Sequence, residues 1–220
     1  MLFSLSHSLD DSFEYEGVSG KVDMSFDNVI LMFETQTRED MDAYLKLIVS
    51  LQLLVGDDYE ERGQDFQVGL YQYLMDEYIN DNKPIIDPDA LRNGGGGKED
   101  AEQYSLTEDA EYIFASFLQA YGMDLHDQFK KLHWYKFRAL LAGLPDDTKF
   151  RQVLQIRQWK PYKGVTKEEK QQMQDLQVVY RLHVTQAEAE FARMTPEERD
   201  IYMEEHPELF EPPEDDEPYL

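Results

Sequence analysis

The stretch "HWYKFRALLAGLPDDTKF", residues 133–150, contains the clearest helical pattern of the chain beside a cluster of aromatic and basic side chains. Four apolar residues recur at helical spacing and predict a core-facing side: Phe137, Leu140, Leu141 and Leu144. Gly143 lies near the end of this helix, and Pro145 with Asp146 begins the next one. The stretch therefore predicts two consecutive helices joined by a short turn, as in a helical bundle.

The first of these helices is predicted to extend upstream, so that Phe129 and Leu132 join its core side. The opposite side then carries basic and aromatic residues at i, i+4 and i+7, with a tryptophan on the flank. Such a stripe is usually an ordinary solvated helix face, but Tyr, Trp and Arg are also enriched at binding hot spots. The candidate partner-binding residues are Lys131, Trp134, Tyr135 and Arg138.

Apolar spacing predicts further helices on both sides of this stretch. Upstream, Ser105 and Glu108 fit a capping box ahead of an apolar stripe that Gly122 ends. In the helix that follows Pro145, Phe150 is predicted to face inward together with the two apolar residues of the next turn. A last helix over residues 167–182 is predicted to use these positions for packing: Met173, Leu176, Val179 and Tyr180.

The N-terminal part combines a predicted hairpin with three predicted helices. Apolar residues alternate around "GVSG" between residues 13 and 26, which is typical of a short β-hairpin with a glycine-containing turn. Asp27 is the expected N-cap of the first helix, Gly56 the expected C-cap of the second, and "FQVGLYQYLMDEYI" predicts the third. The predicted fold is mainly α, a compact helical bundle of about six to seven helices with a short N-terminal β-hairpin.

Residues 80–104 divide the chain because they hold two prolines and four consecutive glycines, which no regular element tolerates. The predicted organisation is a hairpin with helices over 1–79, a Gly/Pro-rich linker or loop over 80–104, and a helical subdomain over 105–183. Residues 184–220 are predicted to form one short helix followed by a mobile acidic end. The run "GGGGKE" does not fit a phosphate-binding loop, since Glu99 replaces the hydroxyl residue that would follow the lysine.

The formal net charge of −25 is distributed unevenly along the 220 residues. Residues 1–123 hold 7 Lys or Arg against 26 Asp or Glu, residues 124–182 hold 12 against 7, and residues 183–220 hold 2 against 13. Most of the surface should therefore repel nucleic acid and anionic membranes. The one positive band could meet an acidic partner or the acidic residues that follow it.

Composition and motifs point away from an enzyme. The absence of cysteine excludes disulfides, thiolate nucleophiles and Cys-ligated metal, and no apolar run is long enough to span a bilayer. His126 and His133 are seven residues apart, too far along one helix to share a metal without other ligands. Any pair chosen among 46 acidic residues would be arbitrary as an acid–base couple. We expect no catalytic residue, no metal and no cofactor.

Two separated blocks, "DAEYIFASFLQAYGMDL" and "LHWYKFRALLAGLPDDTKFRQVLQIRQ", resemble the phage protein family called "gene product fifteen" of long-tailed phages and prophages of Gram-positive hosts. The shared features are an acidic-aromatic helix start, a Tyr-Gly-Asp-Leu-like turn, a His-Trp-x-Lys-Phe run and a Leu-Pro-Asp/Glu-Asp-Thr turn in that order. The matching positions in this sequence are Tyr112, Tyr121, Gly122, Asp124, Leu125, His133, Trp134, Lys136, Phe137, Leu144, Pro145, Asp147, Thr148 and Phe150. The resemblance covers residues 13–182, and its first half is looser.

The resemblance implies a helical, non-enzymatic tail assembly chaperone in the host bacterial cytoplasm. Such a protein would bind the tape-measure protein and keep it soluble until the tail tube polymerises, with the major tail protein and a second copy as further candidate partners. Two other hypotheses remain open: an acidic DNA mimic that inhibits a host protein, motivated by the net charge, and a minor structural subunit of the tail. A metal-dependent enzyme is the weakest hypothesis, and no residue pattern favours it.

Overall fold

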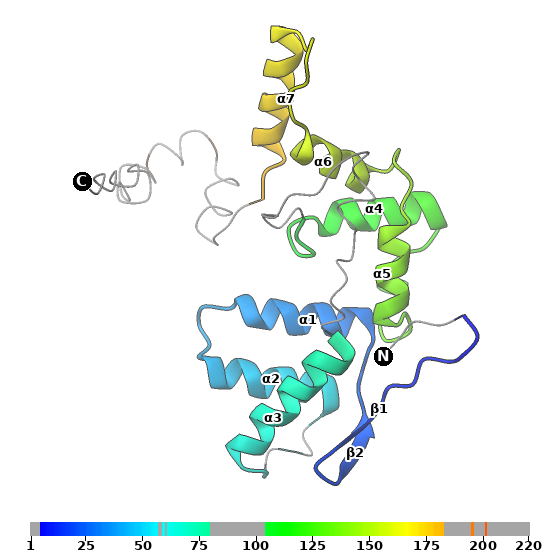
Figure 1. The fold of residues 1–220 in the computed structure, drawn as a ribbon, viewed down its shortest axis with the longest axis vertical. Helices are drawn as coiled ribbons and strands as arrows, with labels where there is room; N and C mark the ends of the chain where they lie inside the picture. The colour runs from blue at the N-terminus through cyan, green and yellow to red at the C-terminus, as the bar shows by residue number, and fades with distance from the viewer. Residues whose placement is uncertain are drawn as a thin grey trace.

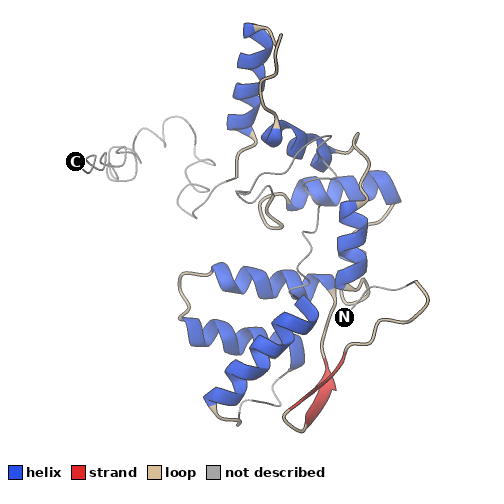
Figure 2. Ribbon diagram, in the orientation of Figure 1, coloured by secondary structure: helices blue, strands red, loops and turns tan. Residues whose placement is uncertain are grey.

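The computed structural model describes residues 5–56, 59, 61–79, 104–182, 195 and 201 of the chain. This part of the chain contains seven α-helices and one hairpin. Figure 1 shows how they are arranged, and Figure 2 shows how little of this part is strand. The elements are β1 Ser12–Tyr15, β2 Val18–Lys21, α1 Phe26–Thr37, α2 Ala43–Val55, α3 Gln64–Leu74, the π-helical turn η1 Met75–Ile79, α4 Ala110–Tyr121, the 3-10 turn η2 His126–Gln128, α5 Trp134–Ala142, α6 Lys149–Gln158 and α7 Lys167–Val179. The predicted mainly α fold with an N-terminal hairpin is confirmed.

The hairpin pairs β1 with β2 in antiparallel register, with Tyr15 opposite Val18. Its two-residue turn is Glu16–Gly17, and both residues have positive φ, as a tight turn between twisted strands requires. The helix that follows begins two residues earlier than predicted, because Ser25 and not Asp27 is the N-cap residue of α1. The carboxylate of Asp27 instead accepts a hydrogen bond from the backbone N–H of Lys130, far away in the sequence.

Helices α1, α2 and α3 form the N-terminal group together with the hairpin (Figure 1). Helix α2 begins where the side chain of Asp42 accepts a hydrogen bond from the N–H of Leu45, and it ends at Gly56 as predicted. Gly69 lies in the middle of α3, where a Cβ would approach the Tyr15 hydroxyl to 2.1 Å. The close approach of the hairpin to α3 explains why this helix contains a glycine.

Helices α4, α5 and α6 form the second group, and α5 points from it toward the start of α1 (Figure 1). Helix α4 ends at Gly122, whose left-handed backbone satisfies the last carbonyls, as predicted. Helix α6 begins after Thr148, and Phe150 lies fully buried against the hydroxyl of Ser116, which accepts the Phe150 N–H at 3.0 Å. Pro145 and Asp146 belong to the turn before α6 and not to the helix itself.

Both groups contribute to one cluster of buried apolar residues. Phe137 of α5 lies at its centre, since its ring packs against Phe26 of α1, Phe117 of α4 and Trp134 at centroid distances of 4.9, 5.4 and 5.7 Å. The ring of Phe137 therefore links the N-terminal group to the C-terminal group. The predicted linker and acidic segment lie almost entirely outside the described residues, so their predicted form stays a prediction.

Candidate partner-binding surfaces

The structure does not expose the stripe that the sequence predicted. Trp134 is 1% exposed and Tyr135 is 6% exposed, so both aromatic side chains belong to the core. The Tyr135 hydroxyl donates a hydrogen bond to the carbonyl oxygen of Tyr78 at 2.8 Å. Lys131 is exposed but precedes the helix, and Arg138 is half-buried. The prediction that Tyr135 faces solvent is therefore wrong, and a binding role stays a prediction that suits Lys131 and Arg138 better than the two aromatic residues.

Trp134 and Tyr135 face the core because α5 begins at Trp134 and not near Phe129. The chain just before it pairs with the segment ahead of α1: the N–H of Phe26 donates to the oxygen of Leu132 at 2.9 Å, and the N–H of Trp134 donates to the oxygen of Met24 at 2.7 Å. Lys130 has a φ of 56°, which no helix interior allows. Because this backbone bridge fixes the direction of α5, it decides which side chains face the core.

His133 completes the start of α5. Its Nδ1 accepts a hydrogen bond from the N–H of Tyr135 at 3.1 Å, so the imidazole serves as the helix cap. Its Nε2 lies 2.9 Å from a carboxylate oxygen of Asp11 just before β1. Since the side chain is only 12% exposed, His133 acts as a joint between the hairpin and α5. The spacing of residues around His133 gives no signal of this double role.

Phe129 was predicted in the core, but it is 47% exposed. Its ring packs against His126 at 5.2 Å and Phe26 at 5.9 Å, and His126 in turn contacts Phe114 of α4 at 5.4 Å. The side chain therefore lies in a half-open aromatic row beside η2. Positive φ at Lys130 turns the chain away before Phe129 can enter the core, and spacing alone gives no signal of that turn.

Several cations of the C-terminal group are held by acids of the same chain. Arg157 makes two hydrogen bonds of 2.7 Å to the carboxylate of Asp109, whose side chain is 1% exposed, and it also donates to the oxygen of Tyr180. Lys130 lies 2.8 Å from a carboxylate oxygen of Asp23. These cations are therefore structural: Arg157 ties the start of α4 to the ends of α6 and α7.

A second set of cations is exposed around α7. Four lysines make no ion pair within the part of the chain that the structure describes: Lys160, Lys163, Lys167 and Lys170. The loop of residues 159–166 runs alongside α7 (Figure 1), and Tyr162 in it is 57% exposed. Its hydroxyl donates to Glu169 at 2.9 Å, which joins the loop to the first turn of the helix. Pro161 and Gly164 mark this loop in the sequence, because both residue types interrupt helices.

Helix α7 projects away from the rest of the described chain, and none of its 13 residues is buried (Figure 1). Gln177 attaches it to the end of α6 by donating to the carbonyl oxygens of Ile156, Arg157 and Trp159. Val179 was predicted to pack inward, but it is 69% exposed, and Val178 beside it is 68% exposed. That prediction is wrong because no other described element covers the end of α7.

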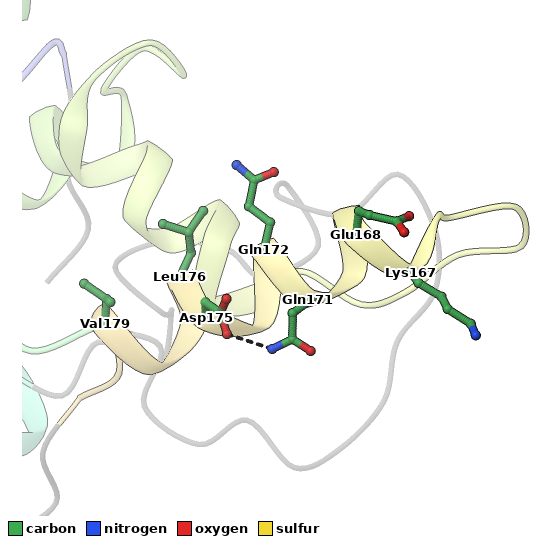
Figure 3. A pocket seen from close by; sticks show the side chains of 7 residues that line it. All are labelled: Lys167, Glu168, Gln171, Gln172, Asp175, Leu176 and Val179. Carbon is green, nitrogen blue, oxygen red and sulfur yellow. Dashed lines mark hydrogen bonds between the residues drawn. The ribbon is translucent and has the colours of Figure 1, made fainter.

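One face of α7 lines an open groove with a volume of about 640 Å³. Figure 3 shows seven side chains that project from this helix around the groove: Lys167, Glu168, Gln171, Gln172, Asp175, Leu176 and Val179. Gln171 donates to Asp175 at 2.8 Å, so part of the polar lining is already ordered. We call α7 together with residues 159–166 the α7 surface. It combines exposed apolar side chains with exposed lysines.

The described residues contain neither a candidate metal site nor a helix that could cross a membrane. Among residues 5–79 and 104–182 as described, no group of three or more His, Asp or Glu side chains could hold a metal ion. The described helices include none with the length and apolarity that crossing a membrane demands. The glycine run at 94–97 lies outside the described residues.

Comparison with known proteins decides the family. The family model described as "Bacteriophage Gp15 protein" matches residues 5–182. The chain belongs to the bacteriophage Gp15 family. No curated protein and no solved structure matches it.

The Gp15 match begins before the hairpin and ends three residues after α7. Every helix and strand named above therefore belongs to the Gp15 part of the chain. Residues 183–220, which carry 13 Asp or Glu against 2 Lys or Arg, follow the match as an acidic addition. The α7 surface is thus the last Gp15 element before this acidic segment.

Proposed function

We propose that this Gp15 protein is a tail assembly chaperone, or a related tail morphogenesis protein, that binds the tape-measure protein. It keeps that partner soluble until the tail tube polymerises around it. The observation that carries the proposal is the α7 surface, a projecting helix with exposed apolar side chains in a member of a phage protein family. Large exposed apolar side chains rimmed by polar residues are typical of protein-binding surfaces.

The composition of the α7 surface suits a partner that must later be released. Leu176 and Val179 supply apolar contacts, whereas Lys167 and Asp175 on the same groove stay solvated and add little affinity of their own. A contact of one helix face is small compared with the interface of a permanent complex. The net charge of −25 would keep a complex with an apolar helical partner in solution.

The proposal includes where the protein acts and what else it meets. It acts in the host bacterial cytoplasm during assembly, and the major tail protein and a second copy of this chain are further candidate partners. It needs no catalytic residue, cofactor, nucleic acid or membrane. Binding and release of the tape-measure protein alone account for the proposed chaperone function.

Co-expression with the tape-measure protein of the same phage tests the proposal. We expect the tape-measure protein to move from the insoluble to the soluble fraction and to co-purify with this protein. A matched pair of variants locates the contact: Val178→Asp with Val179→Asp on α7, and Leu31→Asp on α1, whose side chain is 47% exposed. Only the α7 variant should reduce the recovery of the soluble complex.

Unchanged solubility of the tape-measure protein, with no co-purification, contradicts the proposal. Mass spectrometry of purified virions then separates the remaining hypotheses. A structural subunit would be present at a fixed copy number, whereas a chaperone would be nearly absent. Capture of a basic host protein without any tape-measure binding would favour a DNA mimic.

A further inference from the structure

We propose that the acidic segment, residues 183–220, docks on the α7 surface of its own chain and occupies it until a partner displaces it. The docking stands on the charges and exposure of the described residues, and its role as a competitor rests on the proposed function. The segment follows α7 directly and lies beyond the part that matches the Gp15 family. It is the acidic segment nearest to the exposed lysines in the sequence.

Charge complementarity is the first argument. The acidic segment holds 13 Asp or Glu against 2 Lys or Arg. Elsewhere in the C-terminal group, Arg157 and Arg151 are paired with Asp109 and Asp146, and Lys130 with Asp23. The four lysines of the α7 surface form no such pair within the described residues. Lys131 and Lys136 form no ion pair there either, but the four lysines lie together within residues 160–170, where they outnumber Glu168 and Glu169 and can attract the acidic segment as a group.

Apolar exposure is the second argument. Val178 and Val179 are 68% and 69% exposed, and Tyr162 is 57% exposed in the neighbouring loop. The acidic segment carries apolar side chains between its carboxylates, and one of them, Ile201, is itself 57% exposed. Pairing the two sets would remove apolar surface from water on both sides. A purely acidic sequence would offer charge alone, without this second contact.

The covalent connection is the third argument. Helix α7 ends at Val179, and the acidic segment begins four residues later. A short tether raises the effective concentration of the segment at the α7 surface to the millimolar range, so contacts that would be weak between separate molecules suffice. An incoming partner must then compete with the segment, which makes binding weaker and easier to reverse. The same surface can in this way hold a partner and release it.

Zero-length carbodiimide cross-linking of the full-length protein tests the docking, with peptide mapping by mass spectrometry. The reaction joins a carboxylate to a lysine that touches it. We expect carboxylates of the acidic segment to be joined mainly to lysines of the α7 surface, and much less to Lys21 of the hairpin and Lys136 of α5, both of which are exposed. Raising the salt to about 1 M, where the Debye length is about 3 Å, should remove most of these cross-links.

A variant and an isotope experiment complete the test. Val178→Ser with Val179→Ser keeps every lysine and should lower the cross-link yield severalfold, whereas Leu31→Ser on α1 should leave it unchanged. A mixture of unlabelled and ¹⁵N-labelled protein should give links within one chain. Links between differently labelled chains would instead assign the α7 surface to a second copy, and links spread evenly over all exposed lysines would overturn the docking.

Binding to the tape-measure protein separates this inference from the proposed function. Deleting residues 183–220 should strengthen that binding if the segment competes for the α7 surface. Cross-links on α7 without any tape-measure binding would remove the proposed function and leave the docking in place. Tape-measure binding that the deletion does not change would remove the competition and leave the proposed function.

Discussion

Helices α5 and α7 differ in burial although both carry charged residues and apolar positions at helical spacing. Four of the nine residues of α5 are buried, whereas none of the 13 residues of α7 is. The difference arises outside the helices. A backbone bridge between residues 24–26 and 132–134 holds α5 in the core. Within the described residues, α7 is attached to α6 at its C-terminal end, through Gln177 and Tyr180. Aromatic and basic content therefore does not identify a binding surface until the long-range contacts are known.

The largest expected effect concerns the centre of α5. Phe137→Ala removes the ring that contacts α1 and α4 and should lower the free energy of unfolding by about 4 kcal/mol, because it leaves a cavity among closely packed rings. Tyr162→Ala on the α7 surface should change it by less than about 0.5 kcal/mol. Urea unfolding of both variants measures the contrast. Equal losses would mean that the two regions do not differ in packing.

The ion pair of Asp109 with Arg157 gives the second-largest expected change in the free energy of unfolding. Asp109→Ala leaves the Arg157 guanidinium without its carboxylate in a site where both side chains are nearly buried. We expect a loss of about 3 kcal/mol in the free energy of unfolding, since an uncompensated buried charge is costly. The surface pair of Arg38 with Asp40 is the control, and Asp40→Ala should leave the unfolding curve almost unchanged. Similar urea midpoints for the two variants would contradict a structural role for Arg157.

The orientation of Tyr135 is tested by a smaller change. Tyr135→Phe removes one hydroxyl and leaves the carbonyl oxygen of Tyr78 without this donor, which should cost about 1 kcal/mol. A solvent-facing tyrosine, as the sequence predicted, would give no change. Tyr162→Phe, at a side chain that is 57% exposed and whose hydroxyl donates to the exposed Glu169, is the matched control and should stay close to the wild type.

Sequence reasoning predicted the local elements well, since capping residues and glycines act within one turn. Gly56 and Gly122 end helices where they were expected to. It failed at the start of α5 because the bridge to residues 24–26 joins segments about a hundred residues apart, and helical periodicity carries no record of such a contact. Of the candidate residues, Lys131 lies on the surface as predicted, whereas Trp134 and Tyr135 do not.

The smallest expected effect is a pH dependence at the joint between the two groups. Burial opposes ionisation of Asp23, but hydrogen bonds from Lys130 and Ser25 outweigh it and hold the pKa of this carboxyl below its ordinary value. A lowered pKa in the folded state adds stability above the ordinary carboxyl pKa, and this stability is lost as the pH falls through the folded value.

Asp23→Asn should therefore flatten the acid side of the stability curve below about pH 4. Lys130→Ala removes one donor and should flatten the same region in part. Thermal unfolding between pH 2 and pH 7 measures both. A variant curve that stays parallel to the wild-type curve at every pH would exclude this role for Asp23.

The central claim is that the α7 surface, and not the face of α5, binds the partner. Co-purification of the tape-measure protein with two double variants of equal charge change tests it most directly. Val178→Asp with Val179→Asp alters the apolar part of the α7 surface, and Lys131→Ala with Arg138→Ala alters the stripe predicted from the sequence, each pair lowering the net charge by two. We predict that the α7 variant lowers the amount of bound partner severalfold while the α5 variant binds like the wild type. Loss of binding in the α5 variant alone, with its fold intact by circular dichroism, would contradict the account.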